Sequence, residues 1–155
     1  MRRFVIGMFV ALLALSAGFA PASGLRLVAP AHAQECVVGV TILGNNLPEL
    51  LTGTPNNDQI NGNGGNDTIY GYECDDLLLG GYGNDTIYGA EGHDRINGEQ
   101  GNDTLYGGPD ADQIRGGDGD DHIYGGSGFD QIDGGPGFDV CVPGADGAAV
   151  INCEA

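Results

Sequence analysis

The sequence predicts an all-β protein built from a repeated unit of one turn and one short strand, and three observations support this. Glycine accounts for 30 of the 155 residues, and glycine inside a helix costs roughly 1 kcal/mol relative to alanine. The heptapeptide GNDTIYG occurs at residues 65–71 and again, unchanged, at residues 83–89. Glycine and aspartate also recur every nine residues between positions 53 and 142.

Residues 1–33 have the features of a targeting segment. Arg2 and Arg3 precede an apolar run, and the sequence AHA at residues 31–33 offers a cleavage site of small residues. We therefore expect a secretory signal peptide over residues 1–33, cut after Ala33 or earlier after Ala22. A retained membrane anchor is the alternative, although the apolar run is slightly short for a spanning helix. The mature chain is expected to be secreted and to have no membrane span.

Residues 53–142 divide into ten rows of nine residues, and each row begins with glycine. The eighth place is aliphatic in nine rows and is Cys141 in the tenth. Each row therefore predicts a glycine-rich turn followed by a short strand whose eighth residue points inward. The sixth place is aspartate in all ten rows, at Asp58, Asp67, Asp76, Asp85, Asp94, Asp103, Asp112, Asp121, Asp130 and Asp139.

The rows resemble the haemolysin-type calcium-binding nonapeptide G-G-x-G-x-D-x-U-x of RTX proteins. The row GGYGNDTIY at residues 80–88 fits in full, as do the rows that begin at Gly116, Gly125 and Gly134. The resemblance implies a right-handed parallel β-roll, which is a β-solenoid, with two rows (eighteen residues) per turn and about five turns. Successive rows would then alternate between two facing sheets.

Some rows depart from the pattern, and the register fades outward at the N-terminal side. The rows at Gly62, Gly89 and Gly98 lack only the second glycine. The fourth glycine is replaced by Asn56, Cys74 or Asp110 in three rows, and only cysteine conflicts clearly with a left-handed backbone. A worn row at residues 44–52 places Glu49 sixth and Leu51 eighth. We expect residues 34–52 to form an N-terminal cap with a degenerate repeat, and residues 143–155 to form a C-terminal cap.

The resemblance implies several bound Ca²⁺ ions, held between turns that are neighbours on one edge of the roll. Calcium takes six to eight oxygen ligands, and carboxylates with backbone carbonyls can supply them. One edge would carry Asp67, Asp85, Asp103, Asp121 and Asp139, and the other Asp58, Asp76, Asp94, Asp112 and Asp130. We expect ions at pairs such as Asp85 with Asp103, and Asp112 with Asp130. The alternative is that these aspartates only cap turns.

The net charge favours the calcium reading over turn capping alone. Removing residues 1–33 takes away three of the five arginines and none of the 22 acidic residues, so the formal charge of the mature chain is −20. Charge of one sign opposes a compact state unless cations neutralise it, so calcium binding and folding are expected to be one event. Nucleic acid is excluded as a partner, because its phosphates require basic residues.

All four cysteines lie in the mature part, as expected for an exported protein with disulfide bonds. Cys141 and Cys153 bracket a tail that can fold back over the last coil, which leaves Cys36 with Cys74. A strict register would place Cys36 two turns, or roughly 9.6 Å, from Cys74, which is too far for a bond. Either the segment before about Gly44 leaves the register, or this disulfide is absent.

Enzymatic function is not expected. The mature chain has one serine, Ser127, and its two histidines, His93 and His122, fall in different places of the repeat and on opposite edges. No nucleophile with a neighbouring base is apparent, so a hydrolase is the least favoured reading.

Alternate rows share tyrosine at the ninth place and, in three of them, threonine at the seventh, which predicts ladders on one sheet. These ladders can steady the sheet by cross-strand stacking. Alternatively, they can form an adhesion face for an extracellular protein or a carbohydrate.

Overall fold

A computed structural model of the chain describes residues 36–154, so the predicted signal peptide at 1–33 lies outside the described residues. Residues 36–154 contain no helix, and so none of them belongs to a helix that could cross a membrane. The strands are β1 (Val38–Leu43), β2 (Leu50–Thr52), β3 (Asn57–Asn61), β4 (Thr68–Glu73), β5 (Leu77–Tyr82), β6 (Thr86–Glu91), β7 (Arg95–Gln100), β8 (Thr104–Gly108), β9 (Gln113–Asp118), β10 (His122–Gly126), β11 (Asp130–Asp133), β12 (Val140–Val142) and β13 (Ala148–Ile151).

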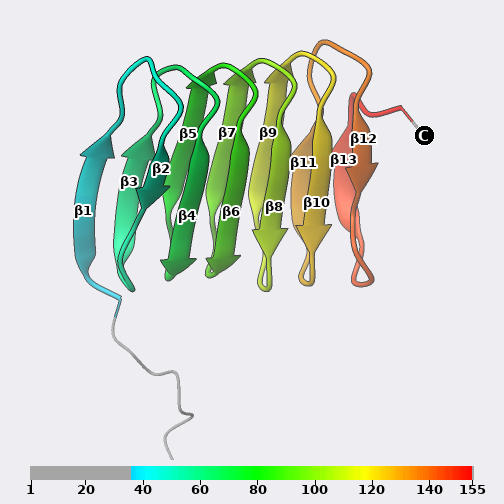
Figure 1. Ribbon diagram of the computed structural model, residues 1–155. Helices are drawn as coiled ribbons and strands as arrows, with labels where there is room; N and C mark the ends of the chain where they lie inside the picture. Colours follow the sequence, from blue (N-terminus) through cyan, green and yellow to red (C-terminus); the bar gives the residue numbers. More distant parts are fainter. Residues whose placement is uncertain (1–35, 155) are drawn as a thin grey trace, which may run out of the picture. The chain divides into compact units, whose positions relative to one another are not determined.

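The strands alternate between two parallel sheets (Figure 1). One sheet has seven strands in the order β1-β3-β5-β7-β9-β11-β13, and the other has six in the order β12-β10-β8-β6-β4-β2. Because every second strand returns to the same sheet, two rows complete one coil. The predicted all-β solenoid is confirmed, and it has about six turns instead of the five expected. The extra strands come from the terminal segments, since β1, β2 and β13 lie outside residues 53–142.

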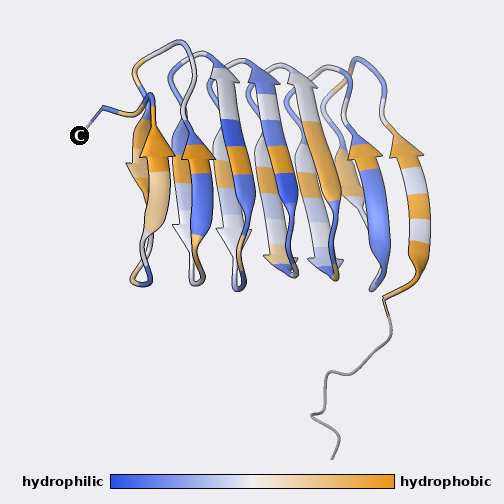
Figure 2. Ribbon diagram, turned by 180° about the vertical axis from the view of Figure 1, so that it is seen from behind, coloured by the Kyte–Doolittle hydropathy of each residue, from blue (hydrophilic) through white to orange (hydrophobic). Residues whose placement is uncertain are grey.

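The two-row repeat fixes the register of the strands. Ile69 pairs with Ile87, and Ile87 pairs with Leu105, so each partner lies two rows further along the chain. The eighth residues of alternate rows therefore stack into one column on the inner side of each sheet. Figure 2 shows hydrophobic positions at similar height on neighbouring strands. The buried core cluster consists of ten side chains: Leu51, Ile60, Ile69, Leu78, Ile87, Ile96, Leu105, Ile114, Ile123 and Ile132.

The N-terminal strand leaves the register, which answers the question left open about Cys36. Thr41 pairs with Gln59, exactly two rows ahead, whereas Val38 pairs with Asn57, one position further than two rows. The irregularity lies between Val38 and Thr41. The structure contains a disulfide between Cys36 and Cys74 with a Cα–Cα distance of 5.8 Å. A second disulfide joins Cys141 to Cys153, with a Cα–Cα distance of 5.9 Å.

The turns place the second residue in the left-handed region of the backbone in nine of the ten rows, and the fourth residue in eight of them. Cys74 stands at a fourth place with a φ of 76°, so it adopts the conformation that glycine adopts elsewhere, such as Gly83 with a φ of 125°. The second place behaves in the same way, with Ala90 at 75° and Glu99 at 76°. The second glycine of the repeat thus has a backbone role, which the sequence analysis assigned only to the fourth.

Candidate metal sites

The ten sixth-place aspartates lie between the sheets, where the glycine-rich turns meet the strands, and all of them are buried. Along each edge, the backbone N–H of one aspartate donates a hydrogen bond to the carboxylate of the aspartate eighteen residues later. The backbone N–H of Asp67 donates to Oδ1 of Asp85 at 2.7 Å, and the N–H of Asp85 donates to Oδ1 of Asp103 at 2.7 Å. On the other edge, the N–H of Asp94 donates to Oδ1 of Asp112 at 2.9 Å. The structure therefore separates the aspartates into the two predicted edge columns.

The second carboxylate oxygen has no hydrogen-bond donor in nine of the ten aspartates. This buried, unpartnered Oδ2 belongs to Asp67, Asp76, Asp85, Asp94, Asp103, Asp112, Asp121, Asp130 and Asp139. Asp58 is the exception, because the backbone N–H and the hydroxyl of Thr54 both donate to its Oδ2. A buried carboxylate oxygen without a partner is costly, so the nine oxygens require either a proton or a cation.

The free oxygens lie beside the first glycine of their own rows. A methyl group at Gly80 would overlap Oδ2 of Asp85 and lie 2.7 Å from the carbonyl oxygen of Gly98 in the next coil. Gly89 is placed in the same way, against Oδ2 of Asp94 and the carbonyl oxygen of Gly107. A carboxylate oxygen and a main-chain carbonyl oxygen thus converge at nine of the ten row-opening glycines, whereas the nearest atoms to a methyl group at Gly125 are from the side chains of Asp130 and Ile132. This crowding explains why glycine opens all ten rows, although its φ there is ordinary.

Burial raises the pKa of these carboxyl groups. It raises the pKa of Asp94 to about 8, opposed by the hydrogen bond from the Asp76 backbone and assisted by repulsion from Asp112 and Asp76. For the same leading reason the pKa of Asp76, Asp103 and Asp112 rises to about 7. Burial raises the pKa of Asp121 to about 6. The negative charge of these columns is therefore unfavourable near neutral pH unless a cation offsets it.

The residues fit a hard cation that takes oxygen ligands. Among the described residues, no cluster of three or more His, Cys, Asp or Glu side chains could hold a metal. An ion in these columns would therefore depend on one or two carboxylates and on main-chain carbonyls, which is a ligand set that calcium accepts. Zinc, which prefers nitrogen and sulfur, does not fit. Nδ1 of His93 instead accepts a hydrogen bond from the backbone N–H of Ala111 at 3.1 Å. His122 begins β10, in the six-stranded sheet.

A second ladder supports one edge from the fifth place of the rows, and the sequence analysis missed it. Oδ1 of Asn66 accepts from the N–H of Asn84 at 3.0 Å, and Oδ1 of Asn84 accepts from the N–H of Asn102 at 2.9 Å. Asp120 continues the series toward Phe138. The recurrence of Asn in the GND segments was the available signal. These side chains fix the spacing between neighbouring turns beside the aspartate column.

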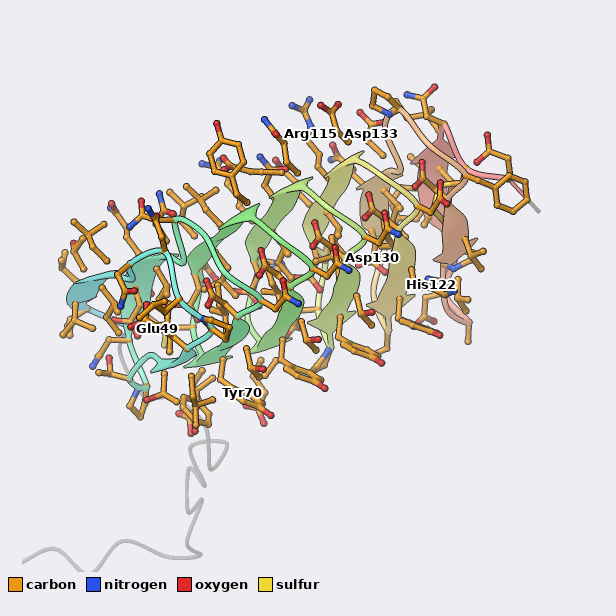
Figure 3. All side chains as sticks on the ribbon, turned by 45° about the horizontal axis from the view of Figure 1, so that its top comes forward. Glu49, Tyr70, Arg115, His122, Asp130 and Asp133 are labelled. Carbon is orange, nitrogen blue, oxygen red and sulfur yellow. A yellow bond between two sulfur atoms is a disulfide. The ribbon has the colours of Figure 1, made fainter. Side chains whose placement is uncertain are left out.

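The outer faces of the two sheets differ in chemistry. Figure 3 shows Tyr70 and His122 on one side of the roll, and Arg115 with Asp133 on the other. On the six-stranded sheet the rings of Tyr70, Tyr88 and Tyr106 stack with centroid distances of 4.8 Å, and Tyr124 follows at 4.9 Å. The inner rings therefore cover each other's faces.

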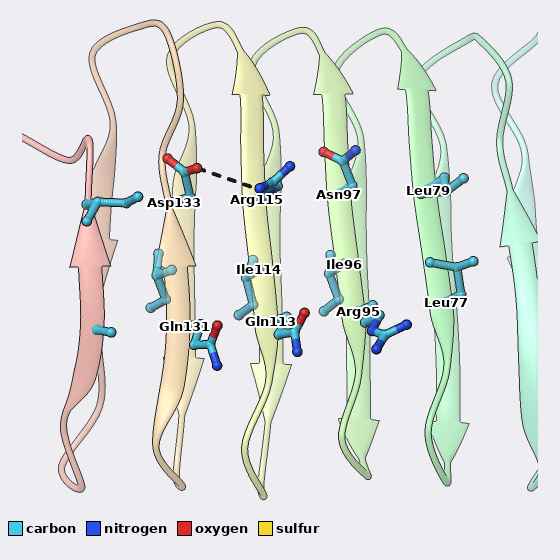
Figure 4. Close-up of a pocket in the computed structure, with 13 residues that line it drawn as sticks. Leu77, Leu79, Arg95, Ile96, Asn97, Gln113, Ile114, Arg115, Gln131 and Asp133 are labelled. Carbon is cyan, nitrogen blue, oxygen red and sulfur yellow. Dashed lines mark ion pairs between the residues drawn. The ribbon is translucent and has the colours of Figure 1, made fainter.

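A shallow groove crosses the outer face of the seven-stranded sheet (Figure 4). Arg95 and Arg115, the two arginines of residues 36–154, both line it. Nε of Arg115 lies 4.0 Å from Oδ2 of Asp133, and the Arg115 side chain is 74 % exposed. The rest of the lining is aliphatic or amide, from residues such as Leu77, Gln113 and Gln131. The groove holds one acidic side chain and no hydroxyl, thiol or imidazole, so it does not offer a nucleophile with a base.

A comparison with protein families matches four copies of the RTX calcium-binding nonapeptide repeat, at residues 43–73, 52–87, 75–105 and 106–141. The matched region takes in the worn row at residues 44–52 and ends just before the C-terminal tail. No curated protein matches the chain. The family match therefore covers the coils that carry both aspartate columns.

Proposed function

Because the chain belongs to the RTX calcium-binding nonapeptide repeat family, we propose that it is an exported protein that binds several Ca²⁺ ions between stacked turns and folds when it does so. The observation that carries this proposal is the set of nine buried aspartate oxygens without a donor. When bound, a calcium ion would be coordinated by those oxygens and would offset the negative charge of the carboxylates.

We assign the ion-holding role to aspartates that are neighbours on one edge, together with backbone carbonyls of the turns. The columns of Asp67, Asp85, Asp103, Asp121 and Asp139, and of Asp76, Asp94, Asp112 and Asp130, carry this role. Asp58 is the weakest member, because Thr54 and the N–H of Val40 already satisfy its carboxylate. Cys74 does not weaken its row, since Oδ2 of Asp76 is as free as the others.

We also propose that the protein works outside the cell. The Cys36–Cys74 and Cys141–Cys153 disulfides fit an oxidising compartment, and residues 1–33 are assigned as the leader that directs export. Residues 34–52 and 143–155 act as caps of the coil. The chain itself is assigned no catalytic activity, because its acidic pairs are accounted for by the repeat.

Replacing Asp103 with asparagine tests the site assignment. Asparagine keeps an oxygen that can accept from the N–H of Asp85 but removes the charge. Mutating a residue that supports a metal site lowers the affinity for the metal about 10–100-fold. We therefore expect Asp103→Asn to raise the calcium concentration needed for half-maximal folding by roughly tenfold or more. The measurement is a calcium titration followed by circular dichroism.

The matched control is Asp118→Asn, which removes the same charge from an exposed side chain and should leave the midpoint within about twofold, because exposed charges interact weakly. Equal midpoints for the Asp103 and Asp118 variants would refute the assignment of the column.

The adhesion alternative rests on the tyrosine ladder and is the second candidate. Its support is the flat row of stacked rings on the six-stranded sheet. Carbohydrates bind aromatic rings through their faces, however, and the faces of Tyr88 are already covered by Tyr70 and Tyr106. Stacking that steadies the sheet is therefore the better account.

A further inference from the structure

Residues 152–154 supply groups that resemble those of a further repeat. After the row at residues 134–142, the chain forms β13 and then closes with Asn152, Cys153 and Glu154. In strict register, Asn152 occupies the first place of a further row, two rows after Gly134. The family match ends at residue 141, so the repeat itself does not explain this tail.

Glu154 makes the bond that a sixth-place aspartate makes in the preceding coils. Its Oε2 accepts from the backbone N–H of Asp139 at 2.7 Å, as Oδ1 of Asp139 accepts from the N–H of Asp121 at 2.9 Å. The N–H of Glu154 donates to the carbonyl oxygen of Asp139 at 2.8 Å, and the N–H of Val140 donates to that of Asp121 at 2.8 Å. The longer glutamate side chain thus reaches the position from the third place of the row instead of the sixth.

Asn152 supplies the carbonyl oxygen that belongs to the same arrangement. A methyl group at Gly134 would overlap the carbonyl oxygen of Asn152 and lie 2.6 Å from Oδ2 of Asp139. A methyl group at Gly116 would meet the Gly134 carbonyl and Oδ2 of Asp121 in the same way. The disulfide from Cys141 to Cys153 attaches the tail to β12 at this point.

The Asp139 side chain is a second observation that indicates a bound cation here, separate from the contacts of Glu154. It is 0 % exposed, and its Oδ2 has no hydrogen-bond partner. The other edge ends differently, because Asp130 pairs with Ala148, which has no acidic side chain. Only the edge that ends at Glu154 therefore continues its carboxylate column past the last repeat.

We infer that Asp139 and Glu154 hold a terminal Ca²⁺ ion with the carbonyl oxygen of Asn152, outside the nonapeptide repeats. This inference rests on the proposed calcium function of the columns. The tail then acts as a cation-binding cap, and its disulfide positions Glu154 as a metal ligand.

The test counts calcium ions by native mass spectrometry of the mature, oxidised chain, at the lowest calcium concentration that saturates the wild type. Glu154→Gln should bind one ion fewer than the wild type. Asp139→Asn should bind two fewer, because its carboxylate borders the Asp121 and Glu154 intervals. Glu91→Gln, which removes an exposed acid on β6 outside both columns, should bind the wild-type number.

The outcomes separate the two proposals. A wild-type chain that binds no calcium would overturn the proposed function itself. A wild type that binds calcium, with an unchanged count in Glu154→Gln, would overturn the terminal site alone. If Glu154→Gln does not fold, Asp139→Asn decides, since the loss of only one ion contradicts a site on its C-terminal side.

Discussion

In nine of the ten sixth-place aspartates, all except Asp58, the two carboxylate oxygens have different roles. One oxygen accepts a backbone N–H from the preceding coil on the same edge, as Asp103 does from Asp85. The other oxygen is buried without a donor beside the first glycine of its row. Turn capping by aspartate would use the first oxygen only. The unused second oxygen is what separates a metal site from a structural turn.

At the residue scale, the left-handed second place of the turn predicts a stabilising substitution. Ala90 has a φ of 75°, whereas glycines at the same place, such as Gly108, have a φ of 127°. A left-handed backbone costs an L-residue about 1–2 kcal/mol, and glycine removes this cost. Glycine also makes the unfolded chain more flexible, which destabilises the folded protein by about 0.4–1 kcal/mol. Ala90→Gly should therefore stabilise the calcium-loaded protein by up to about 1.6 kcal/mol, measured by urea unfolding.

Ala111→Gly is the matched control for this substitution. Ala111 is not among the residues with positive φ, so glycine there only loosens the unfolded chain and should destabilise the protein by about 0.4–1 kcal/mol. Changes of the same sign in the two variants would contradict the account of the second place.

At the scale of the element, the repeated unit is one turn with its strand. The outward side chains of each strand contact those of the strand two rows away. Tyr88 stacks on Tyr70 and on Tyr106, whereas Tyr124 stacks on Tyr106 alone. Tyr88 therefore has two ring partners in the ladder, whereas Tyr124 has one.

This difference predicts unequal costs of removing the rings. Aromatic pairs contribute about 0.5–1.5 kcal/mol beyond burial, so Tyr88→Ala should cost about one such pair more than Tyr124→Ala. Thermal unfolding in saturating calcium measures both variants. If Tyr124→Ala proves as costly as Tyr88→Ala, the ladder does not steady the sheet as proposed.

Most elements could be predicted from the sequence because each row repeats the same local chemistry. Aspartate at the sixth place and isoleucine at the eighth fix the turn, the inward side chain and, with the family resemblance, the two edges. The position of the slip between Val38 and Thr41 could not be predicted, since the row at residues 35–43 has no glycine at its first place and no aspartate at its sixth. Glu154 was not predicted for a related reason, because its side chain reaches the column from the third place of the row, whereas the column aspartates all stand at the sixth.

At the scale of the whole molecule, a small core coexists with a large negative charge. Ten aliphatic side chains make up the buried cluster, and residues 34–155 carry two arginines against 22 acidic residues. Repulsion of this size opposes folding. Calcium ions along both edges would both cancel charge and join neighbouring coils, which explains why one repeated unit contains both the glycines and the aspartate.

The raised pKa values predict how the calcium-free chain responds to pH. Burial raises the pKa of Asp94 from 3.8 to about 8 and that of Asp103 from 3.8 to about 7. A raised folded-state pKa means that the folded chain holds protons that the unfolded chain releases. This contribution to stability is complete below about pH 4 and is lost as the pH rises through about 7 to 8.

Calcium-free protein should therefore unfold at a lower urea concentration at pH 8 than at pH 5. Saturating calcium should remove or reverse this dependence, because the ion binds the deprotonated carboxylates. Calcium-free stability that increases from pH 5 to pH 8 would contradict the burial of uncompensated carboxyl groups.

The most direct test of calcium-dependent folding is the far-ultraviolet circular dichroism of the oxidised mature chain at pH 7.5, first with a chelator and then with millimolar calcium. Magnesium at the same concentration serves as the control, because it demands stricter octahedral geometry and keeps its water ligands. We predict a weakly structured chain in chelator, a large gain of β-structure with calcium, and little gain with magnesium. A chain that is fully β-structured in chelator, with a spectrum that calcium leaves unchanged, would contradict the account.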